Sequence, residues 1–436
     1  MSKRCESVEK DRGKGQVREQ ERSRTPVIWI RADGNEEIAT GHLVRCLTIG
    51  AALKREGARV WLLVSDHGSE RLAEQFMRSY EPYVPDGICV LGSRFDDPDG
   101  ERQTLEKIWE GTDGGSAPCC CPRPDFVLVD SYFATESYLS FLQARVPTGY
   151  LDDMLRFDPP VSLVVNYDVV IPEQFYRTQE EMGGQGEFGE EDDSETGAGV
   201  LRTLLLGPSF APLRPQFAAV PYTIRKNVSR ILVSTGGSDP CGAALALVRR
   251  FEADPVLSRL EWEVVIGSLN RDRDVLRQLA EEVPQLRLRE NVSDMAELMR
   301  KCDLAVTAGG TTLYELCAVG VPSVVYSMAE NQIAEAEAFA SAGIGFYEGD
   351  VREETFGESE TGDAARRQMD SACGETRGGE QSGKGHGIGV FDRITARLSA
   401  LCGDYPLRLE QSEKMRCLTD GRGAQKIAKE ILRLCR

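Results

Sequence analysis

His42 is the first residue of the chain whose surroundings suggest chemistry. An apolar run at residues 27–30 is followed by a polar loop, and a helical pattern begins near Thr40, which is a suitable N-cap residue. This order of strand, loop and helix places His42 in the first helical turn, at the carboxyl edge of a sheet, where open α/β folds bind their ligands. The positive end of a helix disfavours a charged imidazolium and favours a neutral ring that accepts a proton. We therefore interpret His42 as a general base, with a structural, capping histidine as the alternative.

Two glycines, Gly309 and Gly310, follow another apolar run and precede a second helical pattern. Glycine lets backbone N–H groups approach a ligand closely, and the start of a helix adds partial positive charge, so the pair and Thr311 after it suit a diphosphate. A tight turn without a ligand is an equally good interpretation. Glu315 is ambiguous as well, because it completes a capping-box pattern from Thr312 and is also placed to accept both hydroxyls of a ribose.

A second pair, Gly236 and Gly237, also stands between an apolar run and a helix start, where Asp239 and Pro240 fit the N-cap and the first helical position. These glycines are expected to shape the floor of a cleft. Neither pair matches G-x-G-x-x-G or the Walker pattern, so dinucleotide and ATP binding are not indicated, and we expect no cofactor.

Metal ligands are not indicated either. The 13 cysteines include no C-x-x-C pair, and Asp97-Pro98-Asp99, which matches the D-x-D of some sugar transferases, lies in an acidic turn with glycine and proline. Asp130 and Asp153 follow apolar runs and are placed to face a ligand, although an acidic residue in such a position is more often a helix cap.

Parallel sheets are needed to hold these residues. Short apolar runs alternate with helical patterns, which is typical of βαβ units and predicts an α/β fold. The helix after His42 should pack on its sheet through a stripe of small or apolar residues: Leu43, Cys46, Leu47, Gly50 and Ala51. The runs expected to form strands are residues 27–30, 60–64, 126–129, 162–165, 231–234, 263–266, 304–307 and 323–326.

The length of 436 residues fits two domains. We expect two Rossmann-like domains whose parallel sheets face a central cleft, at residues 26–218 and 219–436, joined through the proline-rich stretch 208–222. Residues 1–25 are charged and are expected to be a disordered leader. Residues 111–122, 183–199 and 353–389 are interpreted as surface insertions, because such segments bury too little apolar area to offset the cost of ordering them.

The net charge of −18 opposes binding to nucleic acid or to an anionic membrane surface. No apolar run approaches the roughly 20 residues that cross a bilayer, and the N-terminal residues have no apolar signal core. We expect a cytoplasmic protein whose partner is a small molecule. An anionic ligand is compatible with the net charge, since a helix N-terminus and one or two basic side chains are enough for a local phosphate site.

Several motifs occur together, in one order, between about residue 28 and residue 347. They are Arg31-Ala32-Asp33, Gly41-His42 with Arg45-Cys46, Val129-Asp130 with Tyr132, Asp152-Asp153, Gly207-Pro208 with Leu213-Arg214-Pro215, Gly236-Gly237-Ser238-Asp239, Ala308-Gly309-Gly310-Thr311 with Tyr314-Glu315, and Asn331-Gln332. In this combination the chain resembles the nucleotide-sugar hydrolases of pseudaminic acid biosynthesis and the related spore-coat polysaccharide proteins. It departs from their pattern at Ala39, where the family commonly has glycine, and at Ser131, where it commonly has histidine.

The resemblance implies a GT-B fold and metal-independent hydrolysis of UDP-2,4-diacetamido-2,4,6-trideoxy-β-L-altropyranose to UDP and the free sugar. It implies that His42 activates a water, which attacks the anomeric carbon with inversion. The C-terminal domain would bind UDP through Arg225, Glu315, Asn331 and Gln332, and Tyr132 would lie beside the sugar. Further substrate contacts are expected from Arg31, Asp33, Gly41, Arg45, Asp130, Asp153, Gly236, Gly237, Gly309, Gly310 and Thr311.

Two other functions stay open. A GT-B glycosyltransferase would use the same UDP site and place an acceptor alcohol where the hydrolase holds water; a basic, apolar membrane-docking face would favour it, and the sequence shows none. A protein that binds a nucleotide sugar without turnover is the third possibility, and the presence of His42 argues against it.

Overall fold

The computed structural model describes residues 24–35, 38, 40–110, 121–172, 175–176, 202–237, 239–267, 270–353 and 388–436. The expected leader and the three expected insertions lie wholly or mostly outside these residues, as do Ala39 and Ser238. The order or disorder expected for those segments therefore stays a prediction.

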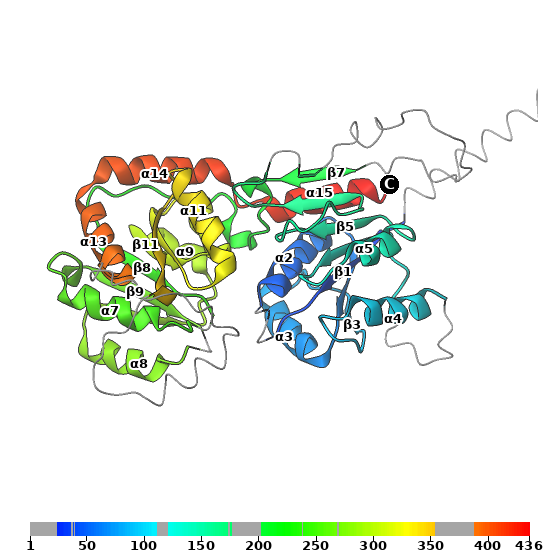
Figure 1. Cartoon of the computed structure of the whole chain (residues 1–436), viewed down its shortest axis with the longest axis horizontal. Helices are drawn as coiled ribbons and strands as arrows, with labels where there is room; N and C mark the ends of the chain where they lie inside the picture. The colour runs from blue at the N-terminus through cyan, green and yellow to red at the C-terminus, as the bar shows by residue number, and fades with distance from the viewer. Residues whose placement is uncertain are drawn as a thin grey trace, which may run out of the picture. The chain divides into compact units, whose positions relative to one another are not determined.

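The chain forms two α/β units (Figure 1). The first unit contains the described parts of residues 1–221 together with 317–319 and 416–436, and the second contains those of 222–316 and 320–415. This division differs from the expected one at the C-terminus, because helix α15 (Gly423–Leu434) returns to the first unit and packs on α2 (Gly41–Arg55). Ile427 and Ile431 of α15 are fully buried in the same core as Leu43 of α2. Burial of this apolar face explains why the last helix leaves the second unit.

In the described part of the first unit, seven parallel strands form one sheet in the order β3-β2-β1-β4-β5-β6-β7. The strands are β1 (Val27–Ala32), β2 (Arg59–Val64), β3 (Gly87–Val90), β4 (Phe126–Asp130), β5 (Thr148–Leu151), β6 (Leu163–Asn166) and β7 (Thr203–Leu206). Because all pairs are parallel, the carboxyl ends of the strands lie at one edge, where Ala32 of β1 pairs with Asp130 of β4.

Helices cover both faces of this sheet. Alternate residues of β1 point to opposite faces, so Ile28 and Ile30 enter the core beneath α2 and α15, whereas Val27 and Trp29 enter the core on the other side. The expected apolar stripe of α2 is buried, and a Cβ added to Gly50 would lie 3.4 Å from Ile30 Cδ1, which shows how closely the helix packs on the sheet. The remaining helices of this unit are α3 (His67–Met77), α4 (Pro98–Glu110) and α5 (Glu136–Gln143).

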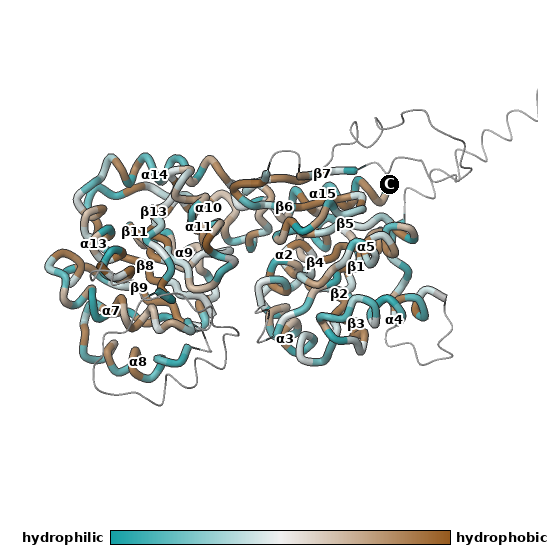
Figure 2. Tube along the Cα trace, in the orientation of Figure 1, coloured by the Kyte–Doolittle hydropathy of each residue, from teal (hydrophilic) through white to brown (hydrophobic). Residues whose placement is uncertain are grey.

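The second unit has its own parallel sheet, in which six strands of the described chain follow the order β10-β9-β8-β11-β12-β13. Its strands are β8 (Arg230–Ser234), β9 (Glu261–Ile266), β10 (Leu286–Glu290), β11 (Leu304–Ala308), β12 (Ser323–Ser327) and β13 (Phe346–Asp350). Its helices are α7 (Ala243–Ala253), α8 (Arg273–Glu282), α9 (Met295–Lys301), α10 (Thr311–Val319), α11 (Ile333–Ser341), α13 (Val390–Gly403) and α14 (Tyr405–Leu418). The expected α/β fold with two parallel sheets is confirmed. Figure 2 shows hydrophobic colour gathered in the sheets, while α4 and α8 are mostly hydrophilic.

The proline-rich stretch 208–222 is packed rather than extended as a spacer. It contains two 3-10 turns, and Ala211, Leu213 and Phe217 are buried. A Cβ added to Gly423 of α15 would lie 2.1 Å from the carbonyl oxygen of Ala211, so the two segments touch directly. No helix in the described ranges is both long and apolar enough to cross a membrane.

Candidate active site

His42 is the second residue of α2, which begins at Gly41. Thr40 occupies the expected N-cap position and its carbonyl accepts a hydrogen bond from Val44 N at 3.1 Å, but its side chain makes no capping bond. The predicted helix start is therefore confirmed, and the predicted side-chain cap is wrong. The His42 side chain is only 3% exposed. Its position after β1 brings it to the carboxyl edge of the first sheet.

Asp130, the last residue of β4, holds the His42 ring. Asp130 Oδ1 lies 2.6 Å from His42 Nδ1, and Arg45 Nη2 lies 2.9 Å from the same nitrogen. A guanidinium only donates and an ionised carboxylate only accepts, so the tautomer depends on the charge of Asp130. With Asp130 ionised, Nδ1 carries the proton and donates it to the carboxylate, which leaves a lone pair on Nε2. Nε2 has no hydrogen-bond partner among the described residues.

Arg45 keeps Asp130 ionised. Its Nε donates to Asp130 Oδ2 at 2.6 Å, and its Nη1 donates to Asp153 Oδ2 at 2.8 Å and to the Tyr167 hydroxyl at 2.6 Å. Burial alone would raise the pKa of Asp130, but the charges of Arg45 and His42 lower that pKa well below its usual range. The residues that hold the His42 ring thus come from α2 and from the ends of three neighbouring strands, β4, β5 and β6.

Tyr132 packs against the catalytic candidate. The ring centroids of His42 and Tyr132 are 4.3 Å apart and the rings meet edge to face, with an interplanar angle of 82°. The backbone of Tyr132 is also held in place, because Arg156 Nη1 donates a hydrogen bond to the Tyr132 carbonyl at 2.7 Å. Tyr132 therefore packs against the ring of His42 in addition to the contact with Asp130.

Arg31 and Asp33, expected at the substrate, lie in a buried ion network. Arg31 Nε donates to Glu101 Oε1 at 2.7 Å, its Nη1 lies 2.6 Å from Asp33 Oδ2, and Tyr138 donates its hydroxyl hydrogen to Glu101. Asp33 Oδ1 also accepts from the backbone N–H of Ser65 at 2.8 Å. Arg31 and Asp33 are 2% and 3% exposed, and their expected contact with the substrate stays a prediction.

The second unit contains the predicted glycine turn after β11. Gly310 has a φ of +123° and occupies the N-cap of α10, which has no side-chain cap. Thr311, which is exposed, is the first residue of α10. No N-cap side chain accepts from the first N–H groups of this helix. Gly309 approaches Gln332 so closely that an added Cβ would lie 2.9 Å from Gln332 Cβ. This geometry requires glycine and suits an anion.

The structure excludes the capping-box role that was considered for Glu315. A capping box would need Thr312 at the N-cap, but Gly310 holds that position and Thr312 is the second helical residue. Glu315 is partly buried, one turn into α10. Gln332 accepts a hydrogen bond from Met328 N at 2.9 Å through Oε1, whereas the side chain of Asn331 lies outside the described residues.

The other glycine pair lies at the end of β8. Gly236 has a φ of +80°, and Gly237 approaches Gly267 closely. Asp239 accepts hydrogen bonds from the backbone N–H groups of Ala243 and Ala244, at 2.8 and 2.9 Å. The Asp239 side chain therefore accepts from the first N–H groups of α7, but Gly242 is the N-cap residue and the helix begins at Ala243, so the predicted N-cap at Asp239 and the predicted start at Pro240 are wrong.

Arg225 lies far from the glycine turn. Its Nη1 donates to Asp303 Oδ1 at 2.6 Å, and Asp303 immediately precedes β11, whereas Gly309 follows that strand. A strand of five residues spans roughly 16 Å. The expected contact between Arg225 and UDP is therefore not supported, because the ion pair with Asp303 holds it at the amino edge of the sheet.

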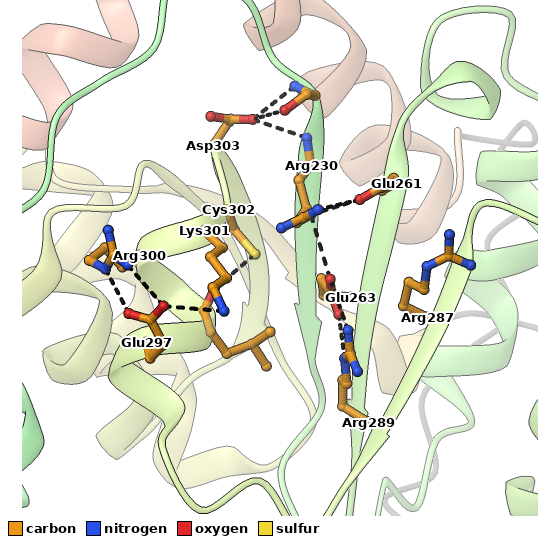
Figure 3. A network of polar contacts seen from close by, with 12 residues as sticks. Arg230, Glu261, Glu263, Arg287, Arg289, Glu297, Arg300, Lys301, Cys302 and Asp303 are labelled. Carbon is orange, nitrogen blue, oxygen red and sulfur yellow. Dashed lines mark hydrogen bonds and ion pairs between the residues drawn. The ribbon is translucent and has the colours of Figure 1, made fainter.

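The surroundings of Asp303 form the charged network drawn in Figure 3. Arg289 Nε donates to Glu263 Oε2 at 2.6 Å, and Arg230 Nε lies 3.5 Å from Glu263 Oε1. Arg230 also pairs with Glu261, so two arginines and two carboxylates from neighbouring strands, β8 to β10, balance one another along the sheet. We interpret this network as structural.

Two supporting residues were missed by the sequence analysis. Tyr167 follows β6 and binds Arg45, and Glu101 in α4 binds Arg31. Tyr167 could have been found, since it lies two residues after the apolar run 162–165. Glu101 lies in the acidic first turn of α4, where the sequence resembles an exposed surface, so no sequence pattern predicted its burial. Within the described ranges, no group of three or more His, Cys, Asp or Glu side chains is arranged to hold a metal ion.

Comparisons with known proteins agree with this two-unit fold. Residues 231–353 match the glycosyltransferase family 28 C-terminal domain. The chain is 30% identical over 219 residues to the spore coat polysaccharide biosynthesis protein SpsG of Bacillus subtilis, covering 50% of this chain and 54% of that protein. The chain thus spans about half the length of this relative.

A shorter match involves a bifunctional protein. Over 54 residues, 12% of this chain and 10% of the other, it is 41% identical to the Helicobacter pylori pseudaminic acid cytidylyltransferase and UDP-2,4-diacetamido-2,4,6-trideoxy-beta-L-altropyranose hydrolase. Among solved structures, the glycotransferase of kitacinnamycin superposes with a TM-score of 0.52 at 16% identity, covering 95% of this chain and all of that one. The chain therefore has a GT-B-type fold, related in its parts to proteins that use nucleotide sugars.

Proposed function

We propose that the protein hydrolyses a UDP-linked diacetamido-trideoxy sugar, with His42 as general base. The observation that carries the proposal is the pair of His42 and ionised Asp130, joined at 2.6 Å, which leaves Nε2 as the proton acceptor. The pair is buried at the carboxyl edge of the first sheet, the place where open α/β folds bind ligands.

The chemistry needs few groups. His42 Nε2 takes a proton from water as the water oxygen attacks the anomeric carbon, and the bond from that carbon to the UDP oxygen breaks with inversion. The imidazolium that forms is stabilised by Asp130, which stays ionised because Arg45 neutralises it. UDP leaves as an anion, and the N–H groups at the start of α10 are suited to stabilise its diphosphate.

The identity of the sugar rests on the shared motifs and on the hydrolase named in the Helicobacter pylori match. Ser131, next to Asp130, is the departure that bears most on this choice. Ser131 lies between Asp130 and Tyr132, which both contact His42, so this segment borders the His42 site. A different acetamido pattern would alter the substrate without altering the mechanism.

Glycosyl transfer is the second candidate. The match of residues 231–353 to a glycosyltransferase C-terminal domain favours it, because that region contains the predicted nucleotide turn. The same base would then deprotonate an acceptor hydroxyl. Hydrolysis and transfer differ only in the nucleophile, so the product distinguishes them.

Turnover in ¹⁸O-labelled water tests the proposal. We expect label at C1 of the released sugar, none in UDP, and an inverted anomer in the first NMR spectra. Label in the β-phosphate would show cleavage of the wrong bond. Release that requires an added alcohol would identify a transferase, and tight UDP binding without any product would identify a binding protein. Asp130→Asn is the matched variant, since it keeps the shape of the site and changes the tautomer of His42.

A further inference from the structure

The second unit contains a cavity that the proposed function does not use. It has a volume of about 260 Å³ and is bordered by the end of α11, β13, α13 and α14. Gly345, in its wall, approaches the carbonyl oxygen of Ser323, the first residue of β12. The cavity therefore lies toward the amino end of these strands, whereas Gly309 and Gln332 lie at the carboxyl end. It is distinct from the predicted nucleotide site.

Buried polar side chains form part of the cavity wall. Gln411 is 2% exposed, and its Nε2 donates to the Ser323 carbonyl at 3.1 Å. Gln411 Oε1 has no hydrogen-bond partner within the described chain. The Glu348 side chain is 9% exposed, and its Oε1 accepts from Arg397 Nε at 2.7 Å. Burying such groups is costly unless they are hydrogen-bonded, so this wall favours a ligand that supplies donors.

The rest of the wall combines an aromatic ring with backbone. The Arg397 guanidinium lies 4.7 Å from the centroid of the Phe346 ring, and Leu407 adds an apolar surface. β13 is the edge strand of its sheet, so about half of its backbone N–H and C=O groups point away from β12. The wall therefore offers donors, acceptors and apolar surface from Phe346 and Leu407.

The charges of the lining cancel. Arg397 pairs with Glu348, and Lys414 pairs with Glu410 at 2.8 Å. Two cations and two carboxylates leave no net charge, which disfavours both phosphates and polyamines. Planar carboxylate, amide and guanidinium groups can bind adjacent hydroxyls without breaking the ion pairs. Drug-sized pockets have roughly 300–1,000 Å³, so this cavity suits a single ring.

We propose that this cavity binds a neutral monosaccharide. The inference does not depend on the proposed function, because none of its residues belongs to the His42 site or to the glycine turns. A free sugar bound here would report on the sugar supply from a position outside the reaction site.

Titration of the full chain with N-acetylglucosamine, followed by calorimetry and by ligand-observed NMR, tests the proposal. We expect saturable binding that persists in His42→Ala and in the presence of saturating UDP. Glu348→Gln and Lys414→Met should each weaken it by about tenfold, equivalent to about 1.4 kcal/mol. Glu413→Gln, an exposed change on α14 outside the lining, is the matched control and should have no effect.

Thermal unfolding of each variant verifies that it is folded. The proposal would be overturned if neither N-acetylglucosamine nor glucose bound saturably, if both lining variants bound as wild type, or if binding disappeared in His42→Ala. Binding of inorganic phosphate or of glutamine at these residues, in preference to the sugars, would also overturn it, because the ligand would then be charged or zwitterionic.

Discussion

His42 and Arg45 lie three residues apart in α2, so their side chains project from neighbouring positions on one face of the helix. Both side chains contact Asp130, but they have different roles. Asp130 orients the His42 ring, whereas Arg45 keeps Asp130 ionised. The candidate base is thus defined by a small buried cluster rather than by one residue.

Asp130→Asn should lower kcat by roughly 10²–10⁴ and leave KM for the nucleotide sugar almost unchanged. The amide no longer requires a proton on Nδ1, so Nε2 loses its defined role as acceptor. Asp153→Asn is the comparison, because Asp153 contacts Arg45 but not His42, and its effect should be smaller. Steady-state kinetics of both variants measure this, and equal losses in the two would contradict the assigned roles.

The stability of the chain should depend on the ionisation of Asp130. Its folded-state pKa lies below its ordinary value of about 4, which we take for the unfolded chain. The stabilisation is then fully present above about pH 4 and is lost as the pH falls toward the folded-state value. In urea denaturation, the difference in unfolding free energy between wild type and Asp130→Asn should shrink from about pH 6 to about pH 3. A difference that does not change with pH would mean that Asp130 is not held ionised.

Sequence reasoning found the members of this cluster but not their contacts. His42, Asp130 and Asp153 were predicted at the site because each follows a strand or begins a helix, and Arg45 was predicted there through the family resemblance. The bonds among them join residues that are 85 to 108 positions apart, apart from His42 and Arg45 themselves. Local patterns carry no signal for such contacts. Arg225 was misplaced for the same reason, since its partner Asp303 is 78 residues away.

At the scale of elements, the turn from β11 into α10 depends on Gly310. Its φ of +123° is strained for any residue with a side chain, so Gly310→Ala should destabilise the second unit by roughly 1–3 kcal/mol. It should also weaken UDP binding by about tenfold, because the N–H groups that follow would be displaced. Calorimetric titration with UDP measures the second effect.

Gly403→Ala provides the matched control for that change. Gly403 ends α13, does not have a left-handed φ, and has no atom within 4 Å of an added Cβ. Its replacement should leave UDP affinity unchanged. If Gly310→Ala bound UDP as tightly as Gly403→Ala, the glycine turn would not be the diphosphate site.

The eight strands expected from apolar runs were all found, and the described residues form five others that were not expected. β10 alternates leucine and arginine, and β5 contains glycine, so neither forms a continuous apolar run. β3, β7 and β13 are short or lie at sheet edges, where burial is incomplete. Central parallel strands are detected as apolar runs because both of their faces are buried. Edge strands are missed because they are less buried and contain more polar residues.

The C-terminal helix should stabilise the first unit. Ile427→Ala removes a fully buried side chain from the core shared with α2 and should cost about 2–5 kcal/mol. Lys429→Ala, on the exposed face of the same helix, should change stability by no more than about 0.5 kcal/mol. In a Trp262→Phe background the remaining tryptophans all lie in the first unit, so urea denaturation followed by fluorescence reports on that unit. An unchanged transition for Ile427→Ala would contradict the packing of α15.

Across the whole molecule, two parallel sheets carry different parts of the proposed reaction. The first has a base and its supports at its carboxyl edge, and the second has glycine turns at the corresponding edge. The fold follows from βαβ patterning, whereas the return of α15 to the first unit does not, because the periodicity of its apolar face does not specify which core it joins.

Release of UDP from UDP-2,4-diacetamido-2,4,6-trideoxy-β-L-altropyranose, with EDTA present and no acceptor, tests the central claim most directly. Wild type should release UDP and free sugar in equal amounts, and His42→Ala should lose roughly 10²–10⁴ of the rate while still binding UDP. Undiminished release by His42→Ala would contradict the assigned base, and no release by a wild type that binds UDP would contradict the hydrolase itself.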